Sequence, residues 1–159
     1  VTGGLISSNH GALPNNGAFV LNNSGNDKTY RIGLPIATLR DGTSKTTLLG
    51  EFAHRNVING KWAAFPGNVR AWIAGQNPGT ARGLYAMKVV KNYGLNERIE
   101  RNVAESDDFN YLPYSSLHTT GAHVAMADSS THFLNDDVDL VVLRAMATRA
   151  GGESDTRIP

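Results

Sequence analysis

The stretch SSLHTTGAHVAMADSSTHF, residues 115–133, holds three of the five histidines of the chain. They are His118, His123 and His132, and Asp128 lies between the last two. Histidine and carboxylate side chains are zinc ligands, and histidine is also the commonest general base in enzymes. Either chemistry needs several of these side chains to converge, so the elements that position them decide the question.

Residues 124–127 and 131–134 have the alternating pattern of two β-strands, and the dipeptide Asp-Ser between them predicts a two-residue hairpin turn. This pairing would put His123 and His132 diagonally on one solvent-facing side of the hairpin. The opposite, core-facing side would then hold Val124, Met126, Thr131 and Phe133. Two ligands are too few for zinc, which takes three or four, so we expect the two histidines to be exposed and without metal.

Other reaction chemistries have weaker signals. The chain has no Gly-x-Ser-x-Gly elbow and no glycine-rich phosphate loop. Glu51 could form a paired-carboxylate site with Asp128, but their spacing does not say that they meet. We therefore expect no enzyme activity, and a cryptic hydrolase that uses His118 and Asp128 is a third hypothesis.

Two binding sites are also conceivable from the residue types. Asn135, Asp136 and Asp137 offer oxygen atoms for a weak calcium site, the one cofactor that the sequence suggests, although capping of a following helix explains them equally well. Trp62 and Trp72 flank or lie within the irregular segment 66–83 and could form a sugar-stacking platform. An extracellular glycan- or ligand-binding module is accordingly the alternative function.

The elements around these residues predict an α+β fold in one domain, residues 1–159. Further strands are expected at residues 18–21, 45–51, 55–58 and 61–65, with Asp41-Gly42 as a turn. A C-terminal amphipathic helix is expected over residues 138–149, with Gly151 just after its end. Its buried stripe would comprise Val138, Val141, Val142, Ala145 and Met146. The expected architecture is a mainly antiparallel, twisted sheet with this helix packed near it.

Composition restricts the partners and the compartment. The net charge of +1 gives no electrostatic reason to bind nucleic acid or an anionic membrane. The chain has no cysteine, which excludes disulfides and thiolate metal sites and suits an extracytoplasmic location, at the cell surface or in the periplasm. No apolar run approaches the roughly 20 residues of a membrane helix.

Three motifs resemble a large bacterial family of prepilin-type proteins that is abundant in planctomycetes. DGTSKTTLLGE, from Asp41 and Gly42 to Glu51, resembles the DGTSNTLLVGE element of that family. His118 and Asp128 have the separation of its His-x9-Asp-Gly domain, with Ser129 in place of the glycine. LRAMATRAGGE resembles its C-terminal helix and its ending, here Gly151, Gly152 and Glu153.

The resemblance implies a pilin-like head, the C-terminal globular portion of a type IV pilin-like or type II secretion pseudopilin-like protein. Such a protein is a structural subunit of a surface filament or secretion apparatus. Its partners would be other pilin-like subunits or an N-terminal part of the same protein, and it would reach the membrane only through an N-terminal helix that this chain does not contain. In this interpretation His118, Asp128 and Glu51 are structural anchors of the hairpin.

Overall fold

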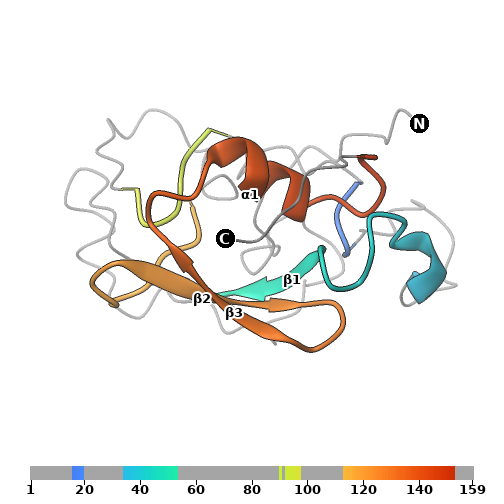
Figure 1. Cartoon of the computed structure of the whole chain (residues 1–159), viewed down its shortest axis with the longest axis horizontal. Coiled ribbons are helices and arrows are strands. Elements are labelled where there is room, and N and C mark those ends of the chain that lie inside the picture. Colours follow the sequence, from blue (N-terminus) through green and yellow to red (C-terminus); the bar gives the residue numbers. More distant parts are fainter. Residues whose placement is uncertain (1–15, 20–33, 54–89, 91, 98–112, 153–159) are drawn as a thin grey trace, which may run out of the picture.

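The computed structural model describes residues 16–19, 34–53, 90, 92–97 and 113–152. Within them a three-stranded antiparallel sheet has the order β1-β2-β3, with β1 at Thr47–Gly50, β2 at Gly121–Met126 and β3 at Thr131–Asn135. The helix α1, Leu140–Met146, lies over one face of this sheet (Figure 1), and a short 3-10 helix spans Ile36–Thr38. The α+β class predicted from the sequence is confirmed.

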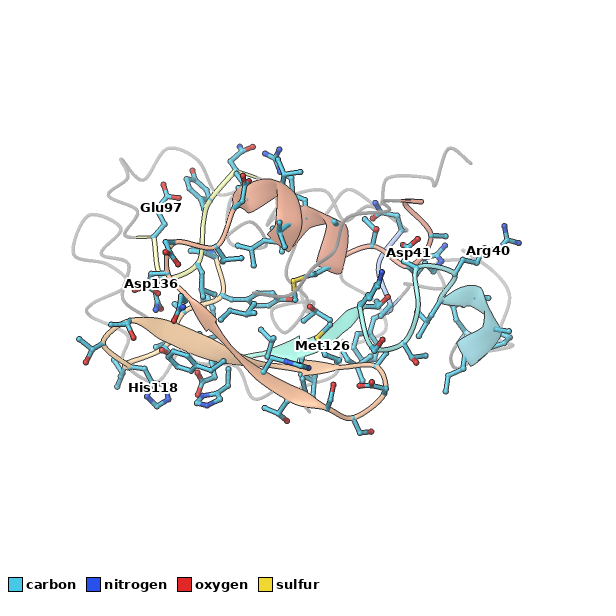
Figure 2. The ribbon with its side chains drawn as sticks, viewed as in Figure 1. Arg40, Asp41, Glu97, His118, Met126 and Asp136 are labelled. Atoms are coloured by element: carbon cyan, nitrogen blue, oxygen red, sulfur yellow. The ribbon has the colours of Figure 1, made fainter. Side chains whose placement is uncertain are left out.

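The core lies between the sheet and α1. Val124, Met126 and Leu134 project from the sheet and are almost fully buried, and Leu143 and Met146 of the helix join the same cluster. Met126 is labelled in Figure 2, on the side of the sheet that faces the helix. Alternate residues of β2 are buried because successive side chains of a strand point to opposite faces.

The hairpin of β2 and β3 is confirmed, but its register differs from the predicted one by one residue. The N–H of Met126 donates to the carbonyl of Ser130, which leaves a loop of three residues rather than two. His123 consequently pairs with Phe133. Because a one-residue slip moves every side chain of a strand to the other face, Leu134 enters the core while Phe133 becomes exposed.

The register shift also corrects the expectations for two other residues. Thr131 is exposed and does not belong to the core face. His132 pairs with Val124, is half-buried, and lies on the opposite face of the sheet from His123. Only His123 is exposed as predicted.

Ser129 explains why the loop has three residues. Its φ is +73°, the left-handed conformation that closes a three-residue hairpin loop and that glycine adopts most readily. Asp128 accepts hydrogen bonds from the N–H and the hydroxyl of Ser130, at 2.9 and 2.6 Å, which confirms its predicted role as a turn residue. A serine at a position that favours glycine stores backbone strain in this turn.

Ser129→Gly should therefore stabilise the protein. We expect a gain of about 0.5–1 kcal/mol in the free energy of unfolding, since the left-handed conformation costs a residue with a Cβ atom about 1–2 kcal/mol and glycine's greater freedom in the unfolded chain returns part of that. Urea unfolding followed by circular dichroism measures the change. Ser44→Gly, at an exposed turn residue for which no positive φ is recorded, is the control and should not stabilise. A loss of stability in Ser129→Gly would contradict the strained turn.

The C-terminal helix is shorter than predicted. It begins at Leu140, after the N-cap Asp139, whose carboxylate accepts the N–H of Val141 at 2.7 Å. It ends at Met146, so Gly151 is not the residue after its end. Val141 is 66% exposed, and Leu143 takes its place in the core. The predicted stripe was wrong at this position because the face that packs on the sheet contains Leu143 and Met146 rather than Val141.

The other predicted elements divide between described and undescribed residues. The strand expected at residues 45–51 contains β1, and the turn at Asp41-Gly42 is confirmed by a φ of +103° at Gly42. Ala18 and Phe19 form a bend, whereas the rest of that predicted strand, the hairpin at residues 55–65, and Trp62 and Trp72 lie outside the described residues. In the part of the chain that the structure describes, no helix has the length and apolar character needed to cross a membrane.

Candidate functional site

Glu51, His118 and His123 gather on the face of the sheet that points away from α1. Figure 2 shows His118 on this side. One potential ligand atom from each of the three residues lies within 4.8 Å of the other two. No other cluster of three or more histidine, aspartate or glutamate side chains with such spacing occurs among the described residues. The sequence analysis expected His118 and Glu51 as structural anchors together with Asp128, and the structure brings these two side chains together with His123 instead.

Strand pairing positions Glu51 and His123. Glu51 follows β1 directly, and its N–H donates to the carbonyl of His123 at 3.2 Å, which extends the β1–β2 ladder by one residue. In return, the N–H of His123 donates to Oε2 of Glu51 at 2.8 Å. The carbonyl of Glu51 accepts the N–H of Ser115 at 3.0 Å, so the backbone of Glu51 is held on two sides.

His118 reaches the cluster from the loop that precedes β2. The hydroxyl of the buried Ser116 accepts the N–H of His118 at 3.0 Å and donates to the carbonyl of Gly121, closing the loop on itself. Asn96 supports the same loop: its Oδ1 accepts the N–H of Ser116 at 2.7 Å and its Nδ2 donates to the carbonyl of Gly121 at 3.1 Å. The loop is thus fixed by side-chain hydrogen bonds rather than by a sheet ladder.

The two imidazole rings approach opposite oxygens of the one carboxylate. Nε2 of His118 lies 3.5 Å from Oε1 of Glu51, and Nδ1 of His123 lies 3.6 Å from Oε2. The ring centroids are 5.1 Å apart, and the Phe133 ring packs edge-on against both at 5.8 and 4.9 Å. Phe133, which is exposed in the observed register, therefore forms the apolar side of this cluster.

The carboxylate of Glu51 is kept ionised by its surroundings. The N–H of His123 lowers the pKa of Glu51 below its ordinary value, and the neighbouring His118 and His123 rings act in the same direction. About half of each histidine side chain and 38% of the glutamate side chain are exposed. The cluster is therefore a solvent-accessible group of three potential metal ligands, two imidazoles and one ionised carboxylate.

Asp128 does not join this cluster. It sits at the tip of the hairpin, five residues beyond His123, which along a strand is about 16 Å. Its carboxylate bonds Ser130, and the hydroxyl and N–H of that serine lower the pKa of Asp128. His118 and Asp128 are therefore two separate structural positions, and the hypothesis of a hydrolase built on this pair has no juxtaposition to support it.

The residues suggested for calcium have other contacts. Asp136 accepts a hydrogen bond from Nδ2 of Asn96 at 2.6 Å. This contact joins the residue after β3 to the turn that contains Asn96. The N–H of Val138 donates to the carbonyl of Asn135 at 3.1 Å. Neither Asp136 nor Asp137 belongs to the cluster of potential metal ligands. The N-cap role expected of this segment is filled by Asp139 instead.

Asp41 joins two of the sequence motifs. Its carboxylate accepts the N–H groups of Gly151 and Gly152 at 2.7 and 3.0 Å and the hydroxyl of Thr148 at 3.3 Å. Gly152 has a φ of +76°, which favours glycine at this position. Figure 2 shows Asp41 where these two parts of the chain meet. Glu153, the last residue of the second motif, lies outside the described residues.

Fold and site together define a small α+β unit with an open histidine–carboxylate cluster on the free face of its sheet. The chain belongs to the family described as "Protein of unknown function (DUF1559)", whose profile matches residues 3–141. Searches of curated proteins and of solved structures found no match. The family match covers the sheet and the whole cluster and ends within α1.

Proposed function

We propose that this chain is the exposed head of a pilin-like subunit, of the type IV pilin or type II secretion pseudopilin kind, in a surface filament or secretion apparatus. The observation that carries the proposal is the Asp41 contact. It gives a structural task to the DGTS and AGGE motifs, on which the resemblance to prepilin-type proteins rests. The contact joins segments about 110 residues apart, so it helps to hold the domain together.

A second long-range contact supports the same interpretation. The guanidinium of Arg149 donates to the carbonyl of Gly17 at 2.9 Å, and the N–H of Arg149 donates to the carbonyl of Asn16 at the same distance. Residues near the start of the chain are thereby tied to the segment after α1. The motif residues in the described part build the fold in this way, which is what a structural subunit requires of them.

The proposal predicts processing by a prepilin peptidase. In the organism that encodes the chain, a chromosomal C-terminal tag and disruption of the prepilin peptidase should cause a longer, membrane-associated precursor to accumulate. Immunoblotting of fractions and intact-mass measurement of the tagged protein give the readout. A protein exported through the ordinary signal peptidase serves as the control and should not change. An unaltered mass and unaltered location of the tagged protein in the disrupted strain would refute the proposal.

A further inference from the structure

We propose that Glu51, His118 and His123 form a surface binding site for a divalent transition-metal ion of the zinc type. This goes beyond a structural head, since it assigns a ligand to the free face of the sheet. The class of ion follows from the donors. Two imidazoles and one carboxylate suit zinc and its neighbours, whereas calcium and magnesium prefer a shell made of oxygen atoms alone.

The distances leave room for an ion among the three side chains. Separations of 3.5 and 3.6 Å between the imidazole nitrogens and the carboxylate oxygens are long for N–H···O hydrogen bonds. With zinc–ligand distances of about 2.0–2.1 Å, two ligand atoms of a tetrahedral site lie about 3.3 Å apart. The two measured separations end on different oxygens of Glu51, and one ligand atom from each residue lies within 4.8 Å of the other two, so rotation of the exposed side chains would have to bring the three atoms to about 3.3 Å from one another.

The donors are also held in place before any ion arrives. The backbones of Glu51 and His123 are hydrogen-bonded to each other, and the N–H of His123 fixes one carboxylate oxygen of Glu51. The backbone of His118 is fixed through Ser116. Phe133 limits the room available to both rings on their apolar side. A ligand set that is already oriented loses less entropy on binding, which raises the affinity for the ion.

The site would be open. Three protein ligands leave at least one position of a tetrahedral zinc ion for water, and the half-exposed side chains leave that position accessible to solvent. The nitrogens are specified as well: His118 would bind through Nε2 and His123 through Nδ1, since those are the atoms that face the carboxylate. This assignment differs between the two histidines and can be observed directly.

Zinc titration of the full 159-residue chain tests the proposal. Isothermal titration calorimetry with zinc chloride should show one equivalent bound, and His118→Ala and His123→Ala should each weaken that binding at least about 10-fold. Nitrogen-15 histidine spectra should show zinc-induced shifts at Nε2 of His118 and at Nδ1 of His123. Circular dichroism and melting curves of each variant establish that it is folded before its affinity is compared.

The other histidines provide the matched control. A variant with His10, His54 and His132 all replaced by alanine retains the three proposed ligands and should keep the one-equivalent binding. Glu51→Gln keeps an oxygen for the N–H of His123 but removes the charge, so it should also weaken binding about 10-fold or more. Absence of zinc binding by the wild-type chain, or full binding by a folded His118→Ala/His123→Ala double variant, would overturn the proposal.

Discussion

Gly121→Ala should lower the stability of the protein more than any other single methyl addition among the described glycines. A Cβ atom at this position would lie 2.0 Å from the carbonyl oxygen of Leu134 and 2.7–2.8 Å from ring atoms of Phe133. The backbone oxygen cannot move without disturbing the β2–β3 ladder, because Gly121 pairs with Asn135 at its end. The clash therefore has to be relieved by separating the two strands.

The expected loss is about 3 kcal/mol or more, the upper end of the range for overpacked sites. For a chain of this size that corresponds to a fall in melting temperature of about 6–12 °C. Displacing Gly121 would also disturb its carbonyl, which accepts hydrogen bonds from Asn96 and Ser116. Thermal unfolding followed by circular dichroism, together with urea titration, measures both quantities.

Gly94→Ala is the matched control for this variant. A Cβ atom at Gly94 would meet nothing nearer than the Glu97 carboxylate at 3.7 Å, and no positive φ is recorded there. We expect no loss and a gain of up to about 1 kcal/mol, since alanine restricts the unfolded chain more than glycine does. If the melting temperature of Gly121→Ala equalled that of Gly94→Ala, the close approach of Leu134 to Gly121 would be wrong.

The hairpin shows where sequence patterns stop determining structure. Its two strands follow from alternation and the position of the turn follows from Asp128, but the loop was predicted with two residues and has three. The register depended on one backbone angle, the positive φ of Ser129. A serine in the sequence does not indicate a positive φ. Since two- and three-residue loops differ by one position, this angle exchanged Phe133 and Leu134 between surface and core.

The candidate site shows a second limit, that of sequence separation. His118 and Glu51 were expected as polar anchors, and the structure does bring them together. Asp128, ten residues further along, was also expected beside His118, whereas the structure places His123 there with Glu51, which directly follows β1. Nothing local in the sequence states that β1 pairs with β2, and only that pairing places Glu51 beside His123.

The helix illustrates a third, smaller limit. Four residues could each have served as the N-cap, and the sequence does not rank them: Asn135, Asp136, Asp137 and Asp139. The structure selects Asp139. The Asp41 contact with Gly151 and Gly152, by contrast, joins segments about 110 residues apart and had no signal apart from the resemblance of the two motifs to one family.

Asn96→Ala should cause the second large loss of stability. The side chain of Asn96 makes three hydrogen bonds, to the N–H of Ser116, the carbonyl of Gly121 and the carboxylate of Asp136. Alanine would leave the N–H of the buried Ser116 without this acceptor, which costs about 1–3 kcal/mol. The φ of Asn96 is +56°, and alanine tolerates that conformation less well than asparagine, at about 1 kcal/mol more.

Together these two effects give an expected loss of about 2–4 kcal/mol, and a third variant separates them. Asn96→Gly accepts the positive φ but has no side chain, so it should lose only the hydrogen-bond part and be about 1 kcal/mol more stable than Asn96→Ala. In both variants the amides of Ser116 and His118 should exchange hydrogen faster, because Asn96 fixes the loop through Ser116 and Ser116 fixes His118. Unchanged exchange at these two amides would show that the loop before β2 is held by other contacts, whatever the change in melting temperature.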